Sequence, residues 1–277
     1  MDSPPDITLP FFAYGTLKPE QPGYHLIEDI IAEPPISAKI RGALFEQDGL
    51  PIFVEKYNDD VRGYVLKFSE PEEAYNRIAD YENERNYEWD VTIAETDNQD
   101  FEVNVLIATD PVRGRVDRIE NNWTVGRDPL FTEALDVVKH TKNTVAEVGS
   151  EQSELEKFFR LQMAYLLLWS SIERYNAFRF GLSAHSVSNR KQMASLDGFR
   201  TGLKTEVPSW RIGEEIFSAD RNKFYTLDPD KPEEAIEYYY QVRSNVTHRG
   251  KSSGIEYGLM HDSLDELSAI FRHYVLE

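Results

Sequence analysis

The residues FAYGTLK, numbered 12–18, end the first predicted strand of this chain in a sharp turn. An apolar run over residues 9–14 leads into Gly15, which has no side chain to restrict the backbone or to cover its N–H groups. N–H groups presented in this way can bind a carboxylate or a developing oxyanion. The candidate ligand-binding residues are therefore Tyr14, Gly15, Thr16 and Leu17, although an ordinary turn at a strand end would explain the same composition.

Short apolar runs continue outward from this turn to about residue 109. They are rich in β-branched and aromatic residues and are separated by Gly, Asp or Asn, which is typical of strands. They cover residues 9–14, 40–45, 50–54, 61–68, 89–93 and 103–107. One helix is predicted at residues 69–81, because Pro71 lies near its start and Ala74, Ile78 and Tyr81 follow at helical spacing. Strands of this number with one main helix predict a small barrel or curled sheet.

The second half of the chain is predicted to be helical. Apolar residues recur at spacings of three and four over residues 130–148 and 154–180, and further helices are predicted from Asp230 to Gly250 and from Ser263 to Tyr274. No element is assigned to residues 181–230. The change of pattern falls between Pro111 and Asp128. We therefore expect an α+β chain of two domains, a β-barrel at residues 1–120 and an all-α bundle at residues 121–277.

Composition restricts the classes of protein to be considered. The chain has 277 residues and no Cys, which excludes disulfides, a thiol nucleophile, Cys-ligated zinc and iron–sulfur clusters. The net charge of −19 divides into −16 for residues 1–140 and −3 for residues 141–277, so the first half should repel nucleic acid. The longest apolar run, Ala164–Trp169, is too short to span a membrane, and the acidic, Pro-rich N-terminus is no signal peptide. We expect a cytoplasmic protein.

Glu82 is a candidate proton carrier. It follows the predicted helix directly after Tyr81, and Tyr87 lies five residues further on. A carboxylate held beside aromatic rings loses hydration, which raises its pKa and allows proton transfer near neutral pH. The alternative is a solvated glutamate in an acidic loop, because Glu84 and Glu88 are close in sequence.

Taken together, these pieces resemble the γ-glutamylcyclotransferase-like family over residues 8–109. The resemblance rests on segments that occur in the family's order: 12–18, 41–45, 49–51, 61–65 and 80–82 with Tyr87. It implies a small β-barrel with a cavity, in which the Tyr14–Leu17 turn holds the α-amino acid end of a γ-glutamyl group. It further implies that Glu82 takes a proton from the attacking α-amine and passes it to the leaving amine, with 5-oxoproline as product. Residues 83–86 lack the usual Gly and Trp89 replaces a common Arg, which leaves the substrate open.

A second candidate site lies near residue 245, at the end of a predicted helix. Arg243 could hold a phosphate, Asn245 could orient a reacting group, and His248 could act as general acid or base in RNA cleavage. Further phosphate contacts are expected from Arg249 and Lys251. The alternative is a set of cations that favour a helix C-terminus. Arg243 and His248 are five residues apart and so lie on different faces of a helix.

Residues from about 130 to 277 resemble a HEPN domain, which is an all-helical bundle. The resemblance rests on Arg243, four residues and then His248, with the usual polar neighbour displaced to Asn245. It implies a metal-independent endoribonuclease that works as a homodimer through the helical domain, with the two motifs sharing a cleft. Glu173 and Arg174, on the preceding long helix, are further candidates for the same site.

Three functions follow from these patterns. The leading hypothesis is a HEPN-type endoribonuclease, a toxin or defence effector with the barrel as a regulatory or ancillary domain. The second is a cyclotransferase acting on γ-glutamylamines or γ-glutamyl peptides. The third is a non-catalytic protein that senses a small ligand. The expected partners are RNA at the helical domain and a γ-glutamyl-type ligand at the barrel, without a membrane. No metal and no cofactor is expected, because no pair of the six His has zinc-site spacing.

Overall fold

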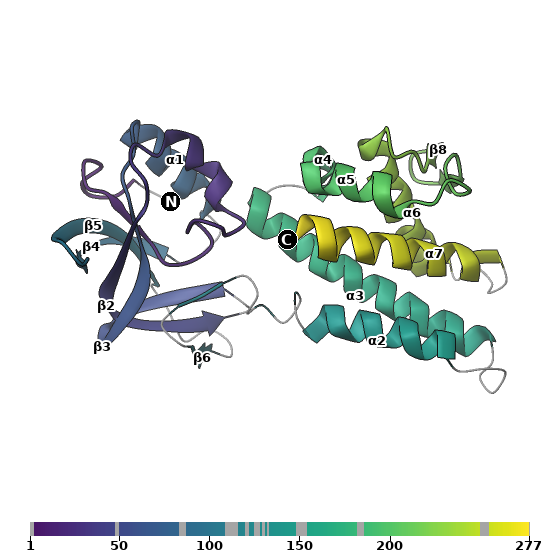
Figure 1. The fold of residues 1–277 in the computed structure, drawn as a ribbon, viewed down its shortest axis with the longest axis horizontal. Coiled ribbons are helices and arrows are strands. Elements are labelled where there is room, and N and C mark those ends of the chain that lie inside the picture. Colours follow the sequence, from purple (N-terminus) through teal and green to yellow (C-terminus); the bar gives the residue numbers. More distant parts are fainter. Residues whose placement is uncertain are drawn as a thin grey trace. The chain divides into compact units, whose positions relative to one another are not determined.

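The computed structural model describes most of the chain, namely residues 3–47, 50–82, 87–108, 116–119, 122–124, 128, 131, 133–147, 154–181, 186–249 and 255–276. The chain divides into two compact units (Figure 1). The first comprises Met1–Phe131 with Ala177–Ser183, and the second comprises Thr132–Asn176 with Ala184–Glu277. The two units are described separately below.

The first unit is built on a β-sheet that closes on itself. Its strands are β1 (Phe11–Ala13), β2 (Ile36–Gln47), β3 (Leu50–Leu66), β4 (Tyr87–Glu95), β5 (Asp100–Ala108) and β6 (Val116–Arg118). They pair in the order β3-β1-β5-β4-β2-β6, and β2 also pairs with β3, so β1 to β5 form a closed barrel. All pairings are antiparallel except β1 with β5, where Phe11 lies opposite Asn104. This confirms the predicted small barrel.

Strand β3 differs from the prediction. Two separate strands were expected at residues 50–54 and 61–68, whereas one strand runs through the polar residues between them. These polar residues pair across to β2, with Arg41 opposite Asp60 and Gly42 opposite Asp59. The register then shifts between Gly42 and Ala43, where Gly42 has a φ of 153° and lies against the Phe53 ring. A side chain at Gly42 would collide with that ring, so the bend in this hairpin requires glycine.

Alternation along β1 directs its side chains to two apolar clusters. Phe12 and Tyr14 belong to a buried cluster that includes Phe53 and Trp123. Phe11 and Ala13 point the other way, into a cluster with helix α1 (Pro71–Tyr81), whose buried residues include Tyr75 and Ile78. The short helices η1 (Tyr24–Leu26) and η2 (Glu28–Ile30) complete this layer. Successive residues of a strand face opposite sides, so this one strand joins both clusters.

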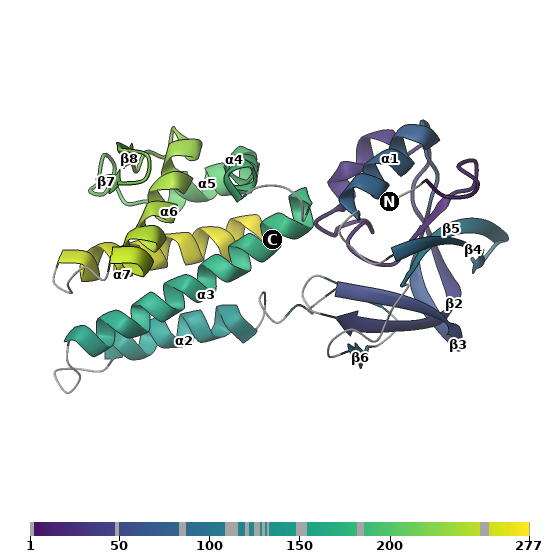
Figure 2. The same cartoon turned by 180° about the vertical axis from the view of Figure 1, so that it is seen from behind.

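The second unit is mainly helical. Its helices are α2 (Glu133–Glu147), α3 (Glu154–Phe180), α4 (Ser186–Ser195), α5 (Asp197–Glu206), α6 (Pro232–Arg249) and α7 (Ile255–Ile270), followed by a π-helical turn at Phe271–Val275; the last residues of α3 are grouped with the first unit. Figures 1 and 2 both show α2 and α7 lying alongside α3. Helix α6 packs against α4, α5 and α7. No helix within the described ranges is long and apolar enough to cross a membrane.

The expectation of an all-α second half is wrong in one place. A β-hairpin made of β7 (Glu215–Ser218) and β8 (Lys223–Thr226) lies in the region to which no element was assigned. Ile216 and Tyr225 stand opposite each other in this hairpin, and both are buried. Strands of four residues are too short to give a clear alternation in sequence, which is why the pattern did not predict them.

A buried ionic cluster joins the loop before this hairpin to two helices. The fully buried guanidinium of Arg211 donates to Oε2 of Glu266 on α7 at 2.9 Å and to Oε2 of Glu214 at 2.9 Å. Tyr238 on α6 donates to the same Glu214 oxygen, and Tyr239 donates to Glu266. Burial raises the pKa of Glu266 to about 7, although Arg211 acts in the opposite direction. This cluster therefore ties the loop before the hairpin to α6 and α7 through hydrogen bonds between ionisable groups.

Candidate active site

The turn after β1 has the geometry of a tight, fixed loop. The Lys18 N–H donates to the Gly15 carbonyl oxygen at 3.2 Å, and the Gly23 N–H donates to that of Thr16 at 3.0 Å. The hydroxyl of Tyr14 donates to the Leu106 carbonyl oxygen at 2.7 Å. A Cβ atom at Gly15 would lie 2.8 Å from Cγ of Pro51, so the backbone and the proline ring pack directly against each other. These contacts hold the turn in one position beside β3 and β5.

Glu82 comes to this turn from a different part of the chain. It is the C-cap residue of α1, and its N–H donates to the Ile78 carbonyl oxygen at 2.9 Å. Only 4 % of the residue is exposed, so it is not the solvated loop glutamate of the alternative hypothesis. The end of α1 is fixed because Ala74, Ile78 and Tyr81 pack into the cluster shared with β1. The carboxyl group is therefore delivered to the barrel by a helix whose packing is set by its apolar face.

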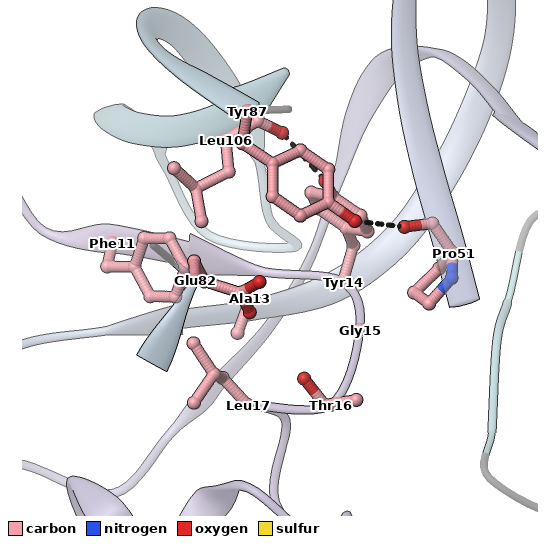
Figure 3. Close-up of a pocket in the computed structure, with 10 residues that line it drawn as sticks. All are labelled: Phe11, Ala13, Tyr14, Gly15, Thr16, Leu17, Pro51, Glu82, Tyr87 and Leu106. Carbon is pink, nitrogen blue, oxygen red and sulfur yellow. Dashed lines mark hydrogen bonds between the residues drawn. The ribbon is translucent and has the colours of Figure 1, made fainter. Parts of the chain in front are cut away.

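Glu82 and all four predicted turn residues line one cavity (Figure 3). The free space that it encloses is small, about 20 Å³. The rest of its wall comes from Phe11, Ala13, Pro51, Tyr87 and Leu106. Tyr87 donates to the Pro51 carbonyl oxygen at 2.8 Å, which joins the start of β4 to the start of β3 on one side of the cavity. A buried carboxyl group thus faces a glycine turn inside a mostly apolar pocket.

This arrangement suits proton transfer next to an anchored polar ligand. Exclusion of water strengthens the electrostatic interactions of a carboxyl group, and a carboxyl group can both accept and return a proton. Backbone N–H groups at a glycine turn can hold a carboxylate or polarise a carbonyl oxygen. The site therefore holds one acid–base group and one potential anion-binding turn.

Lys18 is a residue of this region that the sequence analysis did not nominate, although it ends the FAYGTLK segment. It is only 4 % exposed, and its ammonium donates to Oδ1 of Asn122 at 2.8 Å and to the Trp123 carbonyl oxygen. Burial lowers the pKa of Lys18 to about 8. The sequence contained the residue but no signal of its burial, because lysines next to turns are usually solvated.

The second predicted site is only partly described. Arg243 Nη2 lies 3.5 Å from Oε1 of Glu173, which brings together two of the predicted residues. Asn245 does not join them, because its amide donates to the Phe217 carbonyl oxygen of the hairpin at 3.4 Å. His248 and Arg249 belong to the backbone of α6, but their side chains lie outside the described residues, as does Lys251 altogether. The described residues therefore do not test the predicted nuclease site.

Within the described residues, no group of three or more His, Asp or Glu side chains could hold a metal ion.

Comparison with known families gives one match. Residues 11–125 match the family described as gamma-glutamyl cyclotransferase, AIG2-like. This part of the chain is an AIG2-like domain. The match contains the Tyr14–Leu17 turn, Glu82 and Tyr87, and it includes none of residues 126–277, so it lends no support to the HEPN resemblance.

Two solved structures are weakly similar to this chain. YkqA from Bacillus subtilis is 18% identical with a TM-score of 0.34, over 46% of this chain and 42% of YkqA. The uncharacterized protein PH0828 from Pyrococcus horikoshii is 17% identical with a TM-score of 0.33, over 44% of this chain and 93% of that protein. This chain therefore spans less than half of YkqA. No curated protein matches it.

Proposed function

We propose that the AIG2-like domain is a γ-glutamylamine or γ-glutamyl-peptide cyclotransferase that releases 5-oxoproline. One observation carries this proposal: the buried carboxyl group of Glu82 and the Tyr14–Leu17 turn line the same cavity, although 64 residues separate Glu82 from Lys18 at the end of FAYGTLK. The family match over residues 11–125 supports the same reaction class. The cyclotransferase was the second hypothesis of the sequence analysis, and it now has more support than the endoribonuclease.

The proposed reaction is an intramolecular transamidation. The α-amine nitrogen of the γ-glutamyl group attacks the side-chain amide carbon, which closes a five-membered lactam. The bond from that carbon to the leaving amine then breaks. Glu82 accepts the proton that the attacking nitrogen loses and returns it to the leaving nitrogen, so neither water nor a redox partner is consumed. The Tyr14–Leu17 turn holds the ligand's polar end, which keeps the α-amine close to the carbon that it attacks.

The proposal is tested by assaying the purified full chain with a panel of γ-glutamylamines and γ-glutamyl dipeptides. The measurement is the appearance of 5-oxoproline and of an equal amount of free amine. Release of both products from at least one member of the panel is the expected result. If no member gives 5-oxoproline while one of them binds in the cavity, the barrel is a binding module and the third hypothesis replaces this one.

The endoribonuclease hypothesis for residues 130–277 stays a prediction. Its test is RNA cleavage by the full chain in the presence of EDTA, compared with the variant His248→Ala. Cleavage that persists in EDTA and is lost in the variant would support it. Cleavage that needs a metal, or that survives in the variant, would contradict the chemistry predicted for Arg243 and His248.

A further inference from the structure

Lys18 is a buried cation that the proposed reaction does not use. The residue is 4 % exposed, and both groups that accept its hydrogen bonds are neutral: the Asn122 side-chain amide and the Trp123 carbonyl. Among the residues that the structure describes, no carboxylate forms an ion pair with it. The lowered pKa has burial as its cause, with no opposing contribution from a nearby negative charge.

A buried ammonium without a counter-ion is unusual. Removing a charge from water is strongly unfavourable, and buried lysines and arginines are therefore normally paired with an acid. The second unit follows this rule, because the buried Arg190 pairs with Glu237 and the buried Arg211 pairs with Glu266. Lys18 departs from it. Groups with perturbed charge states next to a cleft are frequently functional.

Two observations connect Lys18 with the cavity. It directly follows Leu17, the last turn residue on the cavity wall, but it does not itself line the cavity. Its acceptor Trp123 packs in the same buried cluster as Tyr14, which does line the cavity. The ammonium is therefore bonded to a residue that packs in the same cluster as Tyr14, without lining the cavity itself. A charge can act on a ligand without touching it, because an apolar core screens the charge weakly.

We propose that Lys18 makes this cavity selective for a ligand that carries a carboxylate at the Tyr14–Leu17 turn. Lys18 acts through space and through the turn that it anchors, so it is a specificity-determining residue rather than a catalytic one. The inference rests on the proposed function for the class of ligand, a glutamyl derivative with a free α-carboxylate. The ligand carboxylate would supply the negative charge that the described protein does not provide.

Two probes of nearly equal shape test this inference, namely 5-oxoproline and its carboxamide. The acid is ionised from about pH 6.5 to about pH 9.5, and the amide is neutral throughout. For the wild-type full chain, we expect the acid to bind more tightly at the low end of this range by on the order of tenfold. The preference should fall as the pH rises through about 8, because the Lys18 ammonium loses its proton there.

Variants separate the charge from the shape of the residue. Lys18→Met should remove the preference for the acid while leaving the affinity for the amide within about threefold. Lys18→Arg should keep the preference and lose its decline at high pH, because arginine stays protonated. Lys56→Met, which removes an exposed lysine of β3, is the matched control and should behave as the wild type.

The other titratable groups that face the cavity are Glu82, Tyr14 and Tyr87, whereas Asn122 and Trp123 are neutral. The pH series is therefore repeated with Glu82→Gln and with Tyr87→Phe. The decline with pH should persist in both variants if Lys18 is its source. A decline that disappears in either variant while Lys18 is present would overturn the assignment.

The remaining outcomes separate this inference from the proposed function. Equal binding of acid and amide, binding of neither, or an unchanged preference in Lys18→Met would overturn the role of Lys18, whether or not 5-oxoproline is released. A preference that depends on Lys18 without any release of 5-oxoproline would support the inference and contradict the cyclotransferase. If Lys18→Met does not fold, the wild-type pH series decides, and a preference that is constant with pH overturns the inference.

Discussion

At the scale of single residues, Glu82 shows how burial changes the chemical role of a side chain. In the sequence it is one of several acidic residues near the end of α1, and only its burial distinguishes it from the exposed Glu72 on the same helix. A buried carboxyl group on a cavity wall can exchange a proton with a bound ligand rather than with bulk water. A substitution at Glu82 can therefore remove proton transfer without changing the shape of the cavity.

Glu82→Gln should therefore stop turnover while preserving binding. We expect kcat for 5-oxoproline release to fall by about 100-fold or more, because the amide cannot carry the proton. The affinity for 5-oxoproline should change by less than about threefold, since the side chain keeps its size. Both are measured on the full chain.

Glu72→Gln is the matched control for this variant, because Glu72 lies on the solvent-exposed side of α1. It should leave both quantities unchanged. A Glu82→Gln protein that keeps its turnover would show that another group moves the proton.

At the scale of elements, α5 illustrates a contact that only a glycine allows. A Cβ atom at Gly198 would lie 1.8 Å from the Tyr274 carbonyl oxygen, which belongs to the π-helical turn after α7. At Gly202, one turn further along, a Cβ atom would lie 2.9 Å from the Ile270 side chain. Helix α5 therefore packs with its backbone directly against the end of the chain.

Gly198→Ala should destabilise the second unit, because its methyl group must displace backbone rather than a flexible side chain. We expect the free energy of unfolding to fall by about 1–3 kcal/mol. Thermal unfolding followed by circular dichroism at the helical band measures this loss.

Gly258→Ala on α7 is the control, since nothing lies within 4 Å of a Cβ atom there. Alanine is the better helix former by about 1 kcal/mol, so this variant should be slightly more stable than the wild type. If both variants were equally stable, the close packing of α5 against Tyr274 would be contradicted.

At the scale of a whole folded unit, the Arg211 cluster links stability to pH. One guanidinium serves two carboxylates, Glu214 and Glu266, and both Glu266 and Arg211 are buried. The pKa of Glu266 is about 7 in the folded protein, above its ordinary value of 4.5. The folded state therefore favours the protonated acid. This contribution to stability is complete below about pH 4.5 and is lost as the pH rises to about 7.

Glu266→Gln should flatten this part of the stability curve. Between about pH 4.5 and about pH 7, the wild type should lose on the order of 2 kcal/mol more than the variant in the free energy of unfolding. Urea unfolding at several pH values, followed by the helical circular dichroism signal, measures the difference. Parallel curves for the two proteins would show that Glu266 keeps an ordinary pKa in the folded state.

The sequence alone was sufficient to predict a small barrel and to nominate the Tyr14–Leu17 turn and Glu82, but it did not predict the continuous strand β3. Alternating apolar residues determine which face of a strand is buried, and this information is local. The family resemblance carried by the segments around FAYGTLK implied the long-range relation between the turn and Glu82, which no local pattern contains. The same reasoning failed for residues 215–226, where strands of four residues leave too few alternations to read.

Some side chains are buried by segments that are far away in the sequence. Only the tertiary structure shows their burial and their charge state. The sequence placed Lys18 beside a turn, but its contacts with Asn122 and Trp123 cross more than 100 residues. Arg211 and Glu266 are likewise 55 residues apart, and their charges interact only when the loop between α5 and β7 packs against α7. Residue type and spacing determine helices, strands and turns because those interactions are local. The charge state of a buried group depends on the polar atoms that folding places around it, and those come from anywhere in the chain.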